Sequence, residues 1–147
     1  MNVYEASIED AEAAAHLFNE YRMFYRQPSD LEGARQFILE RLEKKESVIY
    51  LAKDEHGTAA GFAQLYPSFS SVSMRKIWIV NDLFVTEQER KRGTAGQLLE
   101  RAADLCRKTG AKFLNLETAA DNSSAQRLYE KNQFVKVEDT FFYTRQI

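Results

Sequence analysis

A short basic loop is the part of this 147-residue chain whose residue types and spacing point most directly to chemistry. The loop follows an apolar run that ends at Phe84 and Val85, and it consists of Arg90, Lys91, Arg92, Gly93, Thr94 and Ala95. A strand that leads through such a loop into a helix directs backbone N–H groups and the positive end of the helix dipole toward one point. Small residues let a phosphate approach the main chain, and arginines add charged hydrogen bonds. We therefore expect a phosphate site; the alternative is a solvated basic turn.

A carboxylate inside the apolar run is the second candidate. Asn81 and Asp82 interrupt the run, and a buried polar group there needs a partner or a function. Regular alternation would place Asp82 among apolar side chains, those of Trp78, Val80 and Phe84. Such surroundings raise the pKa of a carboxyl group, which would suit Asp82 to act as a proton acceptor. The alternative for Asp82 is a structural role, with its carboxylate hydrogen-bonded by the neighbouring backbone. Glu117 is the rival candidate for the base; its own alternative is a solvated residue at the end of a strand.

Strands and helices in mixed order must position these residues. Two amphipathic helices are predicted after the first strand, with capping boxes at Ser7–Asp10 and Ser29–Glu32 and a break at Pro28. The predicted strands are Val3–Ala6, Val48–Ala52, Ala60–Tyr66, Lys76–Val85, Phe113–Glu117, Phe134–Val137 and Phe141–Thr144. Helices are predicted at Gly93–Thr109 and Ser123–Asn132. This order predicts an α/β (α+β) sandwich with a central βαβ crossover over Lys76–Glu117.

The strand Lys76–Val85 is expected to be central, because both of its faces are apolar. Alternation assigns one face to Ile77, Ile79, Leu83 and Val85, and the other to Trp78, Val80 and Phe84. No repeat, low-complexity tract or Gly/Pro-rich linker interrupts the chain. We therefore expect a single domain over residues 1–147.

The composition excludes several classes of protein. Hydrophobic residues make up 44% and charged residues 29% of the chain, enough apolar material for one full core. A single cysteine, Cys106, rules out an intramolecular disulfide and favours the cytoplasm, and two histidines leave no zinc cluster, so no metal is expected. The longest apolar run, Ile77–Val80, is too short to span a membrane, and Met1–Glu5 lacks the basic start of a secretory signal. A sequence pI near 5.8 argues against nucleic-acid binding.

Two motifs resemble one known family. Arg90-x-x-Gly93-x-Ala95 fits the pattern (Gln/Arg)-x-x-Gly-x-(Gly/Ala), and about thirty residues later Asn122–Phe134 is similar to Asn-x-x-Ala-x-x-Leu-Tyr-x-x-x-Gly-Phe. Together with the element order, these motifs resemble the GNAT superfamily of acetyl-CoA-dependent N-acetyltransferases. The chain departs from the pattern at Gln133, where glycine is usual, and at Ile79, where some relatives carry a glutamate base.

The resemblance implies a GNAT-like mixed, mostly antiparallel sheet with helices on both faces. It implies that the strands Lys76–Val85 and Lys112–Glu117 splay apart to admit the pantetheine arm of acetyl-CoA, the acyl donor. The backbone N–H of Val85 or Phe84 would then polarise the thioester oxygen. Asn122 would bond the pantetheine arm, unless it only caps the helix that follows.

The implied reaction is direct acetyl transfer to the primary amine of a small molecule such as a polyamine or an amino acid. An alkyl amine is neutral only about once in a thousand at pH 7, so either a general base or a pocket that lowers the pKa of the amine is needed. Tyr129 is the candidate general acid for the departing thiolate; the alternative is a core aromatic residue beside Leu128 and Phe134. Rival functions are acetylation of protein lysines or N-termini, and acyl-CoA binding without turnover. The aromatic C-terminal segment, with Phe134, Phe141, Phe142 and Tyr143, predicts a homodimer.

Overall fold

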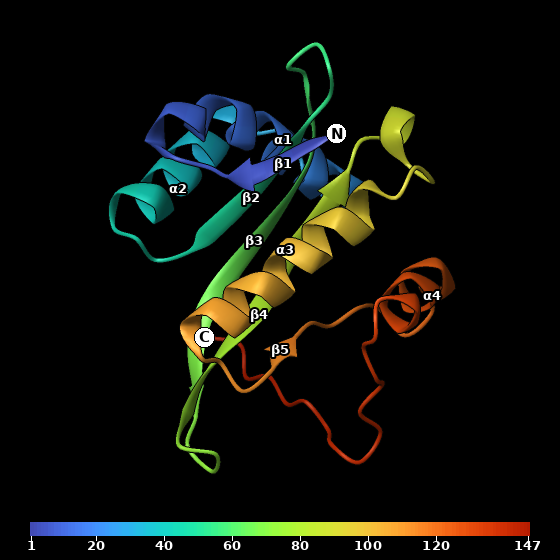
Figure 1. Cartoon of the computed structure of the whole chain (residues 1–147). Coiled ribbons are helices and arrows are strands. Elements are labelled where there is room, and N and C mark those ends of the chain that lie inside the picture. Colours follow the sequence, from blue (N-terminus) through green and yellow to red (C-terminus); the bar gives the residue numbers. More distant parts are fainter. The chain divides into compact units, whose positions relative to one another are not determined.

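A computed structural model describes residues 1–147 of the protein (Figure 1). The chain forms two compact units, Met1–Glu117 and Thr118–Ile147. None of the helices has the length and apolar character needed to cross a membrane.

The first unit is built on one five-stranded sheet. Its strands are β1 (Asn2–Glu5), β2 (Val48–Lys53), β3 (Ala59–Ser70), β4 (Arg75–Val85) and β5 (Leu114–Asn115). They lie in the order β1-β2-β3-β4-β5, and the first three pairs of neighbours are antiparallel. β4 and β5 run parallel, joined through η2 (Glu87–Glu89) and α3 (Thr94–Thr109). The predicted mostly antiparallel sheet and its βαβ crossover are thus confirmed.

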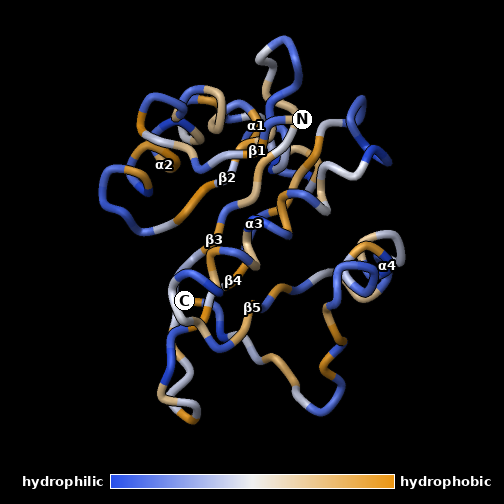
Figure 2. Tube along the Cα trace, viewed as in Figure 1, coloured by the Kyte–Doolittle hydropathy of each residue, from blue (hydrophilic) through white to orange (hydrophobic).

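Helices cover both faces of this sheet, as expected. α1 (Ala11–Phe24), preceded by η1 (Ile8–Asp10), and α2 (Leu31–Glu43) lie on one face, and α3 lies on the other (Figure 1). On the α1–α2 face the buried cluster contains Ala14, Leu17, Ile38, Ile49, Leu51, Phe62 and Phe84. On the other face α3 buries Leu98, Leu99 and Ala102, and its hydrophobic residues alternate with hydrophilic ones along the helix (Figure 2).

The start of α2 differs from the prediction. Asp30, not Ser29, is the N-cap residue, and its carboxylate accepts a hydrogen bond from the Gly33 backbone N–H at 2.9 Å. Ser29 is instead bound by Asn19 of α1, whose side-chain amide donates to the serine hydroxyl at 3.1 Å while its carbonyl accepts the Asp30 N–H at 2.9 Å. The predicted Ser29–Glu32 capping box was wrong, because the Ser29 side chain is hydrogen-bonded to Asn19 of α1 and Asp30 caps α2 in its place.

An irregularity in β4 overturns the predicted assignment of its faces. Gln64 of β3 pairs with Asp82, but the next residue, Leu65, pairs with Val80, so Asn81 is an extra residue in β4. One extra residue reverses the alternation on one side of it. Asp82 and Phe84 therefore share the α1–α2 face with Ile77 and Ile79, whereas Trp78, Val80, Leu83 and Val85 face α3. Trp78 Nε1 accordingly donates to Thr109 Oγ1 of α3 at 2.9 Å.

The second unit contains α4 (Ser123–Lys131) and no strand. The predicted hairpin of Phe134–Val137 and Phe141–Thr144 was wrong: this segment is irregular, and its apolar side chains other than Phe134 are exposed. Two four-residue strands form at best a marginally stable hairpin, so an alternating pattern alone does not fix one. The strand predicted at Phe113–Glu117 is also shorter, Leu114–Asn115.

Candidate active site

The loop between β4 and α3 has a backbone shaped by two left-handed residues. Gly93, the N-cap of α3, has φ +84°, and Lys91 has φ +63°. The first backbone bond of the helix runs from the Gln97 N–H to the Gly93 carbonyl, so the preceding amides have no acceptor within α3. The first turn of α3 also carries no acidic residue to neutralise the positive end of the dipole. The buried Thr94 and the partly buried Ala95 fix this turn against the sheet.

The two arginines of the loop occupy different surroundings. Arg90 Nε donates to the Val85 carbonyl at 3.2 Å, and its guanidinium carbon lies 5.2 Å from the centre of the Phe24 ring. Arg92 is exposed and pairs with Glu89 at 3.4 Å. Arg90 therefore connects the loop to the end of α1, whereas Arg92 remains at the surface.

β4 and β5 separate early, which leaves one edge of β4 without a neighbouring strand. Their pairing consists of Trp78 with Leu114 and Ile79 with Asn115. The Thr86 N–H donates to the Ala60 carbonyl on the β3 side, so by alternation the Phe84 N–H also faces β3. The N–H of Val85 faces the opposite side, where β5 has ended. Of the two amides considered from the sequence, the geometry favours that of Val85 as a donor to a ligand.

Asp82 is a buried carboxylate, 4% exposed, on the α1–α2 face of β4. Its Oδ2 accepts a hydrogen bond from Gln64 Nε2 at 2.6 Å, and its Oδ1 accepts one from Asn81 Nδ2 at 3.2 Å. Burial raises the pKa of Asp82, while hydrogen bonds from Gln64, Asn81 and Tyr21 oppose that rise. The raised pKa expected from the sequence is therefore found, but with different neighbours: Trp78 and Val80 lie on the other face.

Aromatic side chains gather near Asp82 on the α1–α2 face of the sheet. The Tyr21 hydroxyl donates to the Asn81 carbonyl at 3.4 Å, and its ring lies 5.8 Å from Phe62 and 6.3 Å from Phe84. Further along α1 and just after it, Phe24 and Tyr25 are about half exposed. Tyr21, Phe24 and Tyr25 were not among the catalytic or cofactor-binding residues expected from the sequence. Sequence reasoning also missed Gln64, although a lone polar residue within the apolar run Ala60–Leu65 was a signal.

The other site residues predicted from the sequence, Glu117, Asn122 and Tyr129, come later in the chain than Asp82 and the Arg90–Ala95 loop. Glu117 is exposed at the end of the first unit. In the second unit, Asn122 is the N-cap of α4, and its side chain accepts the Ala125 N–H at 3.1 Å. The Tyr129 ring meets Phe134 edge to face, with centroids 6.1 Å apart. The structure therefore contains the structural alternative for each residue: Asn122 caps α4, and Tyr129 packs against Phe134.

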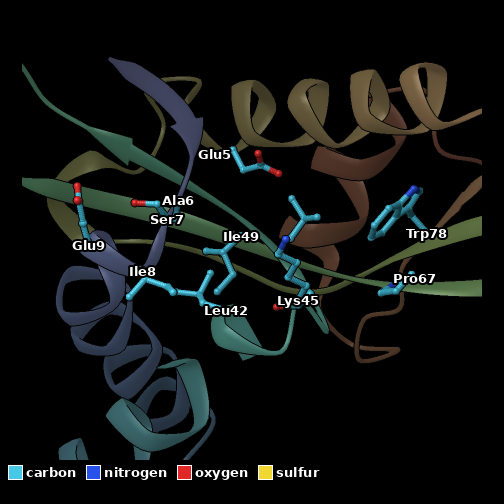
Figure 3. A pocket seen from close by; sticks show the side chains of 12 residues that line it. Glu5, Ala6, Ser7, Ile8, Glu9, Leu42, Lys45, Ile49, Pro67 and Trp78 are labelled. Carbon is cyan, nitrogen blue, oxygen red and sulfur yellow. The ribbon is translucent and has the colours of Figure 1, made fainter. Parts of the chain in front are cut away.

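A separate cleft of about 650 Å³ lies where β1 diverges from β2 (Figure 3). It is lined by Ile8, Leu42, Ile49, Pro67 and Trp78 together with Glu5, Glu9 and Lys45. None of the residues nominated above contributes to it. Ser47 also lines the cleft, and its hydroxyl contacts Gln64. No group of three or more His, Cys, Asp or Glu side chains is arranged to hold a metal ion.

The first unit thus combines a mostly antiparallel sheet, a parallel strand pair that separates early, and a helix N-terminus with open amides. Residues 12–134 match the Acetyltransferase (GNAT) family, and the chain belongs to that family. It is an acetyl-CoA-dependent N-acetyltransferase.

Individual relatives agree with this assignment. The chain is 52% identical to the "Uncharacterized N-acetyltransferase YhfO" of Bacillus subtilis (strain 168) over 97% of this chain and 93% of that protein. A crystal structure described as "a probable acetyltransferase" is 42% identical, with a TM-score of 0.94 over 100% of this chain and 98% of that one. An aminoglycoside N-acetyltransferase, AAC(6')-Iy, in complex with CoA shares the fold at 18% identity, with a TM-score of 0.82 over 99% and 95% of the two chains.

Proposed function

We propose that the protein transfers the acetyl group of acetyl-CoA directly to the primary amine of a small molecule. The observation that carries this proposal is the position of Asp82, a buried carboxylate on the same strand that leads into the Arg90–Ala95 loop. One strand would thereby bring a proton acceptor close to the reacting end of the donor.

The donor side would be held mainly by main-chain groups. The open amides at the start of α3 fit a pyrophosphate, because they are unpaired within the helix and no acidic side chain competes for them. The edge of β4 beyond Ile79 fits an extended arm, and the Val85 N–H would donate to the thioester oxygen. Arg92, Lys91 and Asn122 are proposed to add polar contacts. When bound, acetyl-CoA supplies an acetyl thioester that an amine can attack.

On the acceptor side, Asp82 would take the proton that the amine loses. The amine nitrogen forms a bond to the acetyl carbon, the carbon–sulfur bond breaks, one proton passes to Asp82 and Tyr129 donates one to the sulfur. A carboxylate with a raised pKa is better matched to this task than an ordinary aspartate. Glu117 is the weaker candidate for the base, because it is exposed and lies at the end of the first unit.

Direct transfer is favoured over an acetylated-protein route. Cys106 is the one cysteine of the chain and is buried in α3, where burial raises the pKa of its thiol. A thiol of that kind is a poor nucleophile. The acetyl group would therefore pass within a complex that holds both substrates.

A panel of amines tests the acceptor class. Polyamines, amino acids and aromatic amines would be supplied with acetyl-CoA, and release of the CoA thiol would be measured, with lysine peptides and N-terminal peptides as competitors. Turnover of a small amine that peptides do not inhibit is expected. Preferred turnover of a peptide would favour protein acetylation, and tight acetyl-CoA binding without release would favour a binding module.

We further propose a homodimeric, cytoplasmic protein with a single functional domain. Exposed Val135, Phe141, Phe142 and Tyr143 form an apolar stretch of the kind buried in interfaces. The family match from residue 12 to residue 134 spans both compact units, which supports one domain. Light scattering at micromolar concentration should give the mass of a dimer, and a monomer would contradict it.

A further inference from the structure

Behind Asp82 lies a buried chain of hydrogen bonds that the reaction scheme leaves unused. Gln64 of β3 is fully buried and pairs with Asp82 across the antiparallel ladder. Gln64 Nε2 donates to Asp82 Oδ2 at 2.6 Å, and Ser47, the buried residue before β2, donates from Oγ to Gln64 Oε1 at 2.8 Å. Three neighbouring segments of the sheet thus supply one continuous polar chain inside an otherwise apolar face.

This series of hydrogen bonds makes the two carboxylate oxygens of Asp82 different. With its Oε1 bound by the Ser47 hydroxyl, Gln64 presents its NH₂ group to the carboxylate. An oxygen that accepts an N–H bond at 2.6 Å has its near side occupied by a donor proton. Oδ1 accepts the longer bond of 3.2 Å from the exposed Asn81, and Tyr21 adds a further hydrogen bond to the carboxylate. Because the shorter bond holds Oδ2, an incoming proton would be directed to Oδ1.

We propose that Gln64 is a positioning residue for acetyl transfer: it anchors Asp82 through Oδ2, so that Oδ1 faces the amine and receives its proton. This inference rests on the proposed role of Asp82 as the base.

The other groups around Asp82 do not replace Gln64. Tyr21 approaches from α1 with a hydrogen bond, and Tyr66 lies on β3, where burial and then the charge of Asp82 raise its pKa to about 12. Arg41 of α2 and Glu46 act on Tyr66 and are not among the causes of the pKa shift of Asp82. Hydrogen bonds, led by that of Gln64, are thus what favours the carboxylate form against burial.

The variant Gln64→Met keeps the length of the side chain and removes the donor. The pKa of Asp82 would be read from the ¹³C shift of its carboxyl carbon, assigned with Asp82→Asn, and compared with the pH profile of kcat/KM for the amine. Loss of one hydrogen bond to a charged group should raise this pKa by about one to two pH units. The acidic limb of the rate profile should move by the same amount, with the KM for acetyl-CoA unchanged.

Matched variants keep the test specific. Gln36→Met, the same change at an exposed position of α2, should move neither titration. Gln64→Met should cost no further activity in an Asp82→Asn background, because the group that it positions is already gone. Ser47→Ala, a smaller change that releases Gln64 Oε1, should move the Asp82 titration in the same direction by less, and serves if Gln64→Met does not fold.

An Asp82 titration that stays in place in the folded variants would overturn the inference about Gln64, whatever happens to the rate. A titration that moves while the rate profile does not would instead contradict the proposed function, because Asp82 would then be positioned by Gln64 without acting as the base.

Discussion

On the edge of β4 that faces away from β3, the groups available to a ligand belong to the main chain, whereas on its α1–α2 face they belong to side chains. The edge offers the Val85 N–H and continues to the amides at the start of α3, shaped by the positive φ of Gly93. The face offers Asp82, supported by Gln64 and approached by Tyr21. The edge thus depends on backbone conformation, and the face depends on packing between distant segments. Substitutions should therefore affect the two sides in different ways.

The largest effect is expected on the face, from Asp82→Asn. Loss of a general base should lower kcat/KM for the amine by about 10²- to 10⁴-fold near neutral pH. The loss should shrink as the pH rises toward the pKa of the amine, because more of the amine is then already neutral. Steady-state rates over a pH series, together with the KM for acetyl-CoA, which should not change, check this. A constant loss across the series would contradict the assignment of the base.

The same variant should also stabilise the protein. A raised pKa in the folded state means that the folded protein holds a proton which the unfolded chain has lost, so stability falls as the pH rises from the unfolded pKa to the folded pKa. Asparagine removes this loss and can still accept the bond from Gln64. We expect Asp82→Asn to have a higher Tm than the wild type at pH 7 and the same or a lower Tm at strongly acidic pH.

A side chain proposed for the donor side gives the next largest effect. If Tyr129 protonates the departing thiolate, Tyr129→Phe should lower kcat by about 10- to 1,000-fold and leave acetyl-CoA affinity unchanged, since the ring still packs on Phe134. The loss should be smaller for a thioester whose thiol is more acidic. Wild-type kcat on the best amine, where chemistry limits the rate, would leave Tyr129 as a packing residue.

The variant Gly93→Asn should disrupt the proposed phosphate site at the start of α3. Asparagine tolerates positive φ better than other residues, but its side chain would stand where the phosphate must approach, so the KM for acetyl-CoA should rise about tenfold or more. Gly110→Asn is the matched control, because Gly110 ends the same helix at φ +70° with equally open space around it. An equal KM in both variants would remove Arg90–Ala95 from the donor site.

The smallest effect concerns stability alone. Gln133 follows the last turn of α4 with φ +72°, a conformation that favours glycine, the residue that the family pattern has at this position. Gln133→Gly should raise the free energy of unfolding by about 1 kcal/mol without changing kcat. Urea denaturation measures it; a destabilised variant would show that the glutamine side chain makes a contact worth more than the strain.

The contrast between edge and face also explains what the sequence could predict. The loop could be recognised from the sequence because the small residues Gly93 and Ala95, which permit its backbone conformation, lie within the loop itself. The surroundings of Asp82 could not be recognised, because Asn81 is an extra residue whose effect depends on pairing with β3, and alternation read along one strand cannot detect it. Gln64 and Ser47 became partners of Asp82 only through strand pairing between segments distant in the chain. The prediction of a C-terminal hairpin was wrong for the opposite reason. The alternating pattern was present locally, but no further strands pair with the segment to stabilise it.

Direct transfer in a complex of protein, acetyl-CoA and amine is tested most directly by rapid-quench measurement of the first turnover. The released CoA thiol and the acetylated amine would be quantified together, with and without the amine, and the mass of the intact protein would be recorded. One thiol released for each acetylated amine, no thiol released without the amine, and an unchanged protein mass are expected. A burst of thiol without the amine, with a protein heavier by one acetyl group, would contradict direct transfer.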